Sequence, residues 1–123
     1  MMTGSVNARR EACLPLQVFG PSSQSVDVTT VIDTGYNGTL TLPLAIVQML
    51  ALIPDAHRKV RLGDASVKLL SSYVAEIVWL GRRRQIVILC VEGDPLLGTT
   101  LLDDSHLGVD FRDGGAVSVQ PLP

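Results

Sequence analysis

Short apolar runs separated by turn-forming residues constrain the fold of this chain more than any other feature. Runs rich in Val, Ile, Thr and aromatic residues, bounded by Gly, Pro, Asp and Ser, are typical of β-strands. The turn clusters lie at 20–24, 63–65, 81–83 and 113–115. The strands expected around them lie at 11–19, 25–32, 58–62, 66–80 and 85–91, and in a hairpin over 107–123. We therefore predict an all-β domain of about seven strands.

The segment 25–32 shows the clearest alternation of side chains. Val26, Val28 and Ile32 fall on one face of a strand, while Asp27, Thr29 and Val31 fall on the other. With the run at 11–19 and the turn between them, this segment predicts a β-hairpin. Asp33 directly follows the second strand of this hairpin.

Two short helices are expected among the strands. Pro43 suits the first position of a helix, and apolar residues recur after it at helical spacing through about residue 51, with Pro54 as the stop. Residues 99–105 suit a second helix that a threonine caps and Gly108 closes.

Length and composition favour one globular domain. The chain has 123 residues, 46% of them hydrophobic, which suffices for a core of Leu, Val and Ile. We place the domain at 11–123 and expect 1–10 to be a flexible N-terminal segment. The net charge of −2 gives no general attraction to nucleic acid or to an anionic membrane surface, so neither is expected as a partner.

Secretory and membrane-spanning segments are not expected either. The N-terminus has two arginines but lacks the apolar run of a secretory signal. Residues 34–54 carry no charge, but two glycines and a proline interrupt them, so they fall short of the roughly 20 apolar residues that a span needs. We expect a cytoplasmic protein in which Cys13 and Cys90 are reduced core thiols, with a disulfide between them as the alternative.

Asp33 stands at the inner end of an apolar strand, where a carboxylate is costly unless it is paired or hydrogen-bonded. The Thr34 hydroxyl and the backbone N–H of Gly35 are close enough in sequence to help. An Asp that ends a strand with an Asx turn is one interpretation. A catalytic carboxylate is the other.

Three sequence blocks in a fixed order favour the catalytic interpretation. The first is the apolar strand that leads into Asp33-Thr34-Gly35, and the second is a hairpin around 62–65. The third is Leu96-Leu97-Gly98, followed by a short helix and by V-D-F-x-x-G-G-x-V at 109–117. With these blocks the chain resembles the single-domain, retroviral-type (retropepsin-like) aspartic proteases, specifically their bacterial and archaeal relatives. The resemblance spans roughly residues 12–122.

The resemblance implies a closed, barrel-like acid protease fold with one lobe per chain, and an endopeptidase that uses no cofactor and no metal. It implies that Asp33 is catalytic and that its loop is supported by Thr34, Gly35, Leu97 and Gly98. It implies a flap over the substrate at the tip of the second hairpin. The implied flap and substrate-side residues are Tyr36, Asn37, Leu62, Gly63, Asp64 and Ala65.

The chemistry of these enzymes needs two carboxylates about 3 Å apart that share one proton. No other Asp in this chain is followed by Thr-Gly, and 123 residues are too few for two lobes. A two-fold homodimer would bring Asp33 opposite its own copy. We therefore expect a homodimer that cleaves peptides or unfolded proteins, with Thr34 bonding across the axis by resemblance. The alternative is a non-catalytic dimerisation or peptide-binding module of the same fold.

Two features depart from the family pattern. Tyr36 and then Asn37 follow Asp33-Thr34-Gly35, where retroviral enzymes usually continue with Ala. A bulky aromatic there is expected to narrow or reshape the pocket beside the carboxylates. Asp64 puts a negative charge at the flap tip, which is expected to disfavour acidic peptides or to demand mildly acidic pH.

Other groupings of polar residues carry less weight. Asp103, Ser105 and His106 are nearly contiguous, whereas a catalytic triad is assembled by convergence in space. His57 and His106 have no Cys or His at metal-ligand spacing. The three arginines at 82–84 are interpreted as a solvated hairpin turn.

Overall fold

The computed structural model describes residues 1–61 and 64–123 and shows a mostly β protein. Within these residues there are ten strands and two short helices. The first five strands are β1 (Met2–Val6), β2 (Ala12–Phe19), β3 (Ser25–Ile32), β4 (Thr41–Leu42) and β5 (Ile53–Arg61). The others are β6 (Val67–Trp79), β7 (Arg82–Cys90), β8 (Leu96–Leu97), β9 (Ser105–Val109) and β10 (Ala116–Pro121). The helices are α1 (Leu44–Met49) and α2 (Thr99–Leu102).

The strands form one strongly curved sheet in the order β4-β7-β6-β2-β1-β10-β9, with β3 and β8 joined to β2 and with β5 joined to β6. One edge of β2 pairs with β3, while the other edge pairs with β1 at one end and with β6 at the other. The path of paired strands ends at β4 and β9 and does not return on itself. The prediction of a closed barrel is therefore wrong: in the described residues β4 is only two residues long, and β9 pairs with β10 alone.

The predicted hairpin over 11–19 and 25–32 is confirmed as β2 and β3, which pair antiparallel from Cys13–Val31 to Phe19–Ser25. The N-terminal segment differs from its prediction. Residues 2–6 form β1, which lies between β10 and β2, so part of the segment predicted outside the domain belongs to its sheet. Val6 is buried with Ala12 and Val117 in a small second apolar cluster, which explains why this segment is held to the sheet.

The turn of the β6–β7 hairpin lies at residues 80–81, earlier than the turn predicted at 81–83. Trp79 pairs with Arg82 across a two-residue turn of Leu80 and Gly81, both of which have positive φ. Such turns match the twist of the strands that they join. The arginines at 82–84 therefore lie within β7 and not in the turn.

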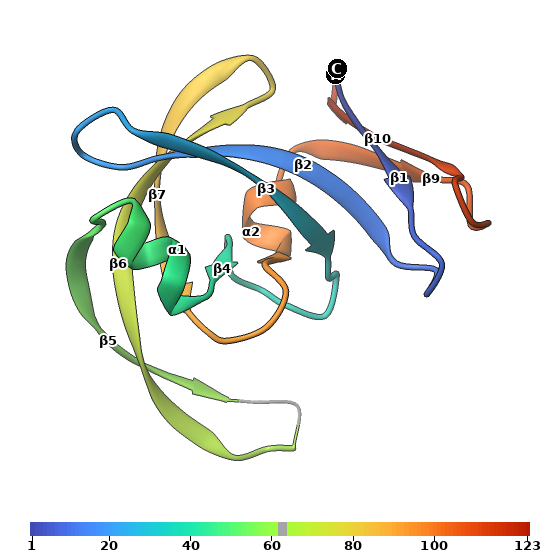
Figure 1. Cartoon of the computed structure of the whole chain (residues 1–123). Coiled ribbons are helices and arrows are strands. Elements are labelled where there is room, and N and C mark those ends of the chain that lie inside the picture. The colour runs from blue at the N-terminus through green and yellow to red at the C-terminus, as the bar shows by residue number, and fades with distance from the viewer. Residues whose placement is uncertain (62–63) are drawn as a thin grey trace.

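The main core fills the space that the curved sheet encloses, around α2, β4 and β8 (Figure 1). Alternate residues of the long strands face this space, as the period of two requires. The fully buried side chains include Leu14, Leu16 and Val18 of β2, Ile77 of β6, Ile88 of β7, Leu97 of β8, Leu101 of α2 and Val119 of β10.

Both helices are shorter than predicted. Pro43 precedes α1 as its N-cap, and Pro54 lies in β5, which begins five residues before its predicted start at 58. Gly98 occupies the N-cap of α2, and Gly108 lies inside β9. Turn residues follow each helix directly, at 50–51 and 103–104, so neither Pro54 nor Gly108 terminates a helix as predicted. No helix in the described part of the chain is long and apolar enough to cross a bilayer.

Both cysteines are free and half-buried, Cys13 in β2 and Cys90 in β7. Burial is the main cause that raises the pKa of each thiol, and the nearby carboxylates Glu11 and Glu92 add to it. No disulfide joins Cys13 and Cys90 in the structure, so the alternative of a bond between them is not seen.

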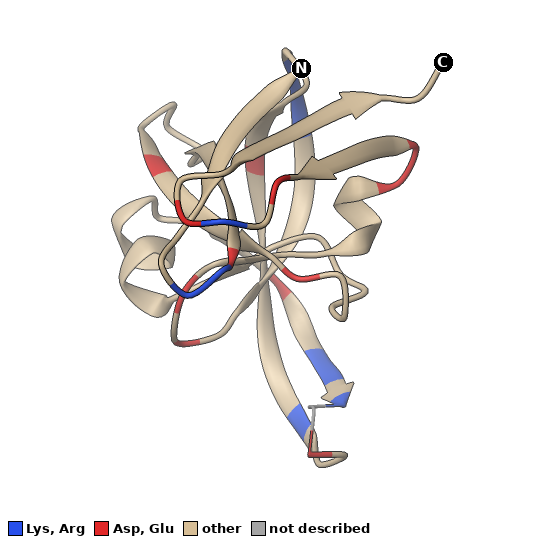
Figure 2. Ribbon diagram, turned by 90° about the vertical axis from the view of Figure 1, so that its right-hand side faces the viewer, with Lys and Arg blue, Asp and Glu red and all other residues tan. Residues whose placement is uncertain are grey.

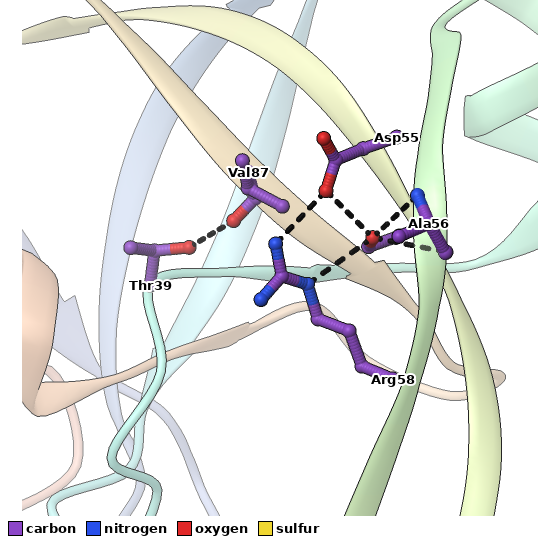
Figure 3. Close-up of polar contacts among 6 residues, drawn as sticks. Thr39, Asp55, Ala56, Arg58 and Val87 are labelled. Atoms are coloured by element: carbon purple, nitrogen blue, oxygen red, sulfur yellow. Dashed lines mark hydrogen bonds and ion pairs between the residues drawn. The ribbon is translucent and has the colours of Figure 1, made fainter.

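A buried serine ties β5 to β6 near the base of their hairpin (Figure 3). The Ser72 hydroxyl accepts hydrogen bonds from the backbone N–H of Ala56, at 3.1 Å, and from Arg58 Nε, at 3.3 Å. It donates to Asp55 Oδ2, which also accepts from Arg58 Nη2 at 2.9 Å. Register shifts between Pro54 and Ala56, and the serine satisfies the backbone at this irregularity.

Replacing Ser72 with alanine is expected to lower the free energy of unfolding by about 1–2 kcal/mol, because the Ala56 N–H loses its acceptor. Urea denaturation at pH 7 measures this. Hydrogen bonds from Arg58 and Ser72 hold the pKa of Asp55 below its usual value. A lowered pKa adds stability only above the unfolded-state pKa of about 3.9, so the difference should shrink as the pH falls below it. Ser71→Ala, on the opposite face, is the control, and equal losses in both variants would contradict the assignment.

Candidate active site

Asp33 follows the last residue of β3 and is held to β8 through its backbone. Ile32 pairs with Leu97 in parallel register, and the N–H of Asp33 donates to the carbonyl of Leu97 at 2.9 Å. Upstream, the N–H of Val31 donates to Pro95 at 2.8 Å. The position of Asp33 is therefore determined by a segment more than 60 residues away in the sequence.

The carboxylate of Asp33 is half-buried and faces its own loop with one oxygen. Oδ1 accepts a hydrogen bond from the N–H of Gly35 at 2.9 Å, and the carbonyl of Asp33 accepts from the N–H of Tyr36 at 3.1 Å. This is the geometry of the Asx turn, the non-catalytic interpretation of Asp33 given above. Within the described residues Oδ2 accepts no hydrogen bond, so this oxygen is available to a ligand or to a second chain.

Gly98 lies where two backbone segments meet. A Cβ on Gly98 would lie 2.3 Å from the carbonyl oxygen of Gly38 and 2.7 Å from that of Tyr36. The N–H of Gly98 donates to Thr39 at 2.9 Å, and the N–H of Thr99 donates to Tyr36 at 2.8 Å. Residues 97–99 thus run directly against the Asp33 loop, and glycine is needed for that approach.

Hydroxyl groups anchor the rest of the loop. Thr100 Oγ1 donates to the carbonyl of Asn37, and Thr99 Oγ1 donates to that of Tyr36 at 3.3 Å. Thr39 Oγ1 donates to the carbonyl of Val87 in β7 at 2.5 Å (Figure 3). The loop that carries Asp33 is therefore fastened to α2 and to β7.

Tyr36 turns back onto this loop. Its ring packs over Gly38 and Gly98, where an added Cβ would clash with ring atoms. Burial raises the pKa of the Tyr36 phenol, which stays neutral at physiological pH. Tyr36 does not line the pocket beside Asp33, so the expected narrowing of that pocket by its ring is not seen. Asn37 is exposed and lines a separate hollow next to α2.

An open pocket of about 390 Å³ lies beside Asp33 and Thr34. Arg10, Glu11 and Phe111 also line it, and Phe111 is 67% exposed. Sequence reasoning missed these three residues. The register of the β2–β3 hairpin could have predicted one of them. Cys13 pairs with Val31, so two residues further along this antiparallel pair Glu11 is level with Asp33.

The structure describes two of the four residues predicted to form the tip of the flap. Leu62 and Gly63 lie outside the described residues. Asp64 and Ala65 lie in the turn; Asp64 Oδ1 accepts from Ser66 N and Oγ at 3.0 and 2.6 Å, and Ala65 has a φ of 67°. The β5–β6 hairpin extends beyond the body of the sheet, and the end of β5 at Arg61 and the start of β6 at Val67 lie away from the ends of β3 and β4 (Figure 1).

The weaker groupings do not form sites. Ser105 and His106 are consecutive in β9, so their side chains point to opposite faces and cannot form a triad. No group of three His, Cys, Asp or Glu side chains that could hold a metal occurs in residues 1–61 and 64–123.

Comparison with known proteins was negative in three respects. No protein-family model, no curated protein and no solved structure matches this chain.

Proposed function

We propose that this protein is an aspartic endopeptidase of retropepsin-like type, active as a homodimer. The observation that carries the proposal is the environment of Asp33. Its backbone N–H donates to Leu97, and one carboxylate oxygen accepts from Gly35. The other oxygen accepts no hydrogen bond from the described residues and lies at an open pocket. A carboxylate on such a rigid support is suited to acid–base chemistry.

The reaction requires the same group from a second chain. Two Asp33 carboxylates about 3 Å apart share one proton because they cannot both ionise. The ionised group takes a proton from a water molecule, which attacks the scissile carbonyl, while the protonated group donates to the carbonyl oxygen. The amine then takes a proton from the dyad as the C–N bond breaks, and a hydroxyl of the tetrahedral intermediate returns its proton to the ionised carboxylate, which leaves the carboxylic acid product and one shared proton. No covalent enzyme intermediate forms.

The surface around Asp33 supports assembly with a second copy. Thr34 is exposed, and its hydroxyl has no partner within the described part of the chain. Phe111 is a large exposed apolar residue at the same pocket. In an isologous dimer each of these residues would meet its counterpart's surface across the axis. Thr34 would bond to the partner's backbone and hold the two Asp33 loops together.

A non-catalytic peptide-binding module is the second candidate. One observation favours it: β5 pairs only with β6 in the described residues, which leaves the outer edge of β5 open to an extended peptide. Addition of a strand to such an edge is a common way of binding peptides. This candidate needs no second carboxylate.

A transition-state mimic separates the two candidates. A pepstatin-type compound carries a hydroxyl that occupies the place of the attacking water, and at 100 times its Kd it should raise the melting temperature by about 10 °C. The protein should also hydrolyse an unfolded substrate protein between pH 4 and 7, and the mimic should block this hydrolysis. No thermal shift and no cleavage by a dimeric sample would favour the binding module.

A further inference from the structure

The outer part of the β5–β6 hairpin, residues 56–61 and 67–71, is called the arm. The arm carries four cationic side chains, Arg58, Lys59, Arg61 and Lys68, in a chain whose net charge is −2. Figure 2 shows Lys and Arg on both strands of the arm. In the views of Figures 1 and 2 the arm extends past the body of the sheet.

The register of the hairpin separates these charges between two faces. Lys59 is opposite Leu69, and Arg61 is opposite Val67, so these four side chains share one face. His57 belongs to the same face, because its Nδ1 lies 3.3 Å from Ser71 Oγ. This inner face continues the side of β6 on which Ala75, Ile77 and Trp79 are buried in the core. Lys68, opposite Val60, lies on the other face.

The charges of the inner face are not neutralised within the described chain. Arg58 pairs with Asp55 at 2.9 Å, and Lys68 lies near enough to Asp64 to help lower its pKa. In residues 1–61 and 64–123, neither Lys59 nor Arg61 has a carboxylate within ion-pair distance. The apolar residues beside them are exposed as well, at 58% for Val67 and 65% for Leu69.

We propose that the inner face of the arm recognises extended peptides that carry two acidic side chains at alternate positions next to an apolar residue. The inference rests on the proposed function and names its substrate class. Lys59 and Arg61 are two residues apart on β5, and an extended peptide repeats its side chains at the same spacing. Two carboxylates at positions i and i+2 of the peptide can therefore meet both cations, while Val67 and Leu69 cover an apolar neighbour.

This proposal reverses the expectation that Asp64 disfavours acidic peptides. Oδ1 of Asp64 accepts hydrogen bonds from both donors of Ser66, the backbone N–H and the hydroxyl. Those bonds are the main cause of its lowered pKa, with the charge of Lys68 contributing as well. The charge of Lys68 therefore partly offsets that of Asp64, whereas in the described residues Lys59 and Arg61 have no carboxylate within ion-pair distance.

Three fluorescein-labelled decapeptides test the recognition directly. They share one apolar sequence and differ only in an alternate pair, Glu-x-Glu, Gln-x-Gln or Lys-x-Lys. Binding is measured by anisotropy with Asp33→Asn protein, so that no peptide is cut, and cleavage is measured with wild-type protein. The Glu peptide should bind about three- to tenfold more tightly than the Gln peptide, as expected for two exposed ion pairs. This preference should fade as salt rises from about 0.05 to 0.5 M.

Matched charge reversals locate the effect. The double variant Lys59→Glu with Arg61→Glu should transfer the preference to the Lys peptide, with the change in KM rather than in kcat. Lys68→Glu makes a reversal of the same sign on the opposite face and should leave the preference unchanged. All three side chains are exposed, so the fold should be retained.

The outcomes distinguish this inference from the proposed function. Equal binding of the three peptides, or an equal shift caused by Lys68→Glu, overturns the recognition by the inner face even if the protein cleaves peptides. Charge-dependent binding without any cleavage supports the recognition, and the proposed hydrolysis alone then fails.

Discussion

Asp33→Asn is expected to abolish peptide hydrolysis, with a loss on the order of 10⁴-fold or more, as for removal of a member of a catalytic unit. In the Asp33→Asn homodimer both carboxylates are replaced by amides, which can neither take a proton from water nor give one to the scissile carbonyl. The fold should persist, because the amide oxygen can still accept the hydrogen bond from Gly35 that Oδ1 accepts at 2.9 Å. Hydrolysis of an unfolded protein and far-UV circular dichroism measure the two effects.

Asp27→Asn is the matched control for this loss. Asp27 lies on the same strand, is exposed, and pairs with Gln17 far from the end of β3. Its removal should leave the rate within about twofold, as for other exposed polar changes. Equal activity of wild-type and Asp33→Asn protein would assign any observed cleavage to a contaminant.

Mixing the two proteins tests whether the site is shared. If each active site needs Asp33 from both chains, an equal mixture refolded together should keep about one quarter of the activity of the same total amount of wild-type protein. A site complete within one chain would keep about one half. The second result would contradict the dimeric mechanism while leaving a role for Asp33.

Gly98→Ala is expected to destabilise the fold by about 3 kcal/mol, at the upper end of overpacking effects. The added Cβ would lie 2.3 Å from the carbonyl oxygen of Gly38, and this neighbour is backbone that cannot rotate away. To make room, the 97–99 segment has to separate from the Asp33 loop and give up hydrogen bonds such as that from Gly98 to Thr39. Urea denaturation should show the loss, and the melting temperature should fall by about 10–15 °C.

Gly108→Ala is the matched control, because Gly108 also lies in a tight place. Its added Cβ would be 3.0 Å from Ser118 Oγ, a hydroxyl that can rotate out of the way. This variant should lose less than about 1 kcal/mol. Similar losses in the two variants would mean that the contact between Gly98 and the Asp33 loop is not the reason for the glycine.

Local patterns predicted the elements whose formation depends on near neighbours. The β2–β3 hairpin has the predicted bounds within one residue, because its alternation and its turn lie in one continuous stretch. The Asx turn at Asp33 and the C-terminal hairpin follow the same rule. Predictions failed where a distant segment decided the outcome. Residues 2–6 form β1 because they pair with β2 and with β10, which comes from the other end of the chain.

The same distinction between local and distant causes holds for the candidate site. The sequence by itself determined that a carboxylate ends an apolar strand and that a glycine follows two leucines at 96–98. Only the tertiary structure decided that these segments touch, that Arg10, Glu11 and Phe111 surround the same pocket, and which cations of the arm stay unpaired. The physical reason is that strand alternation and turns are set by the backbone geometry of adjacent residues. Pockets and ion pairs depend instead on the register between strands that are far apart in the chain.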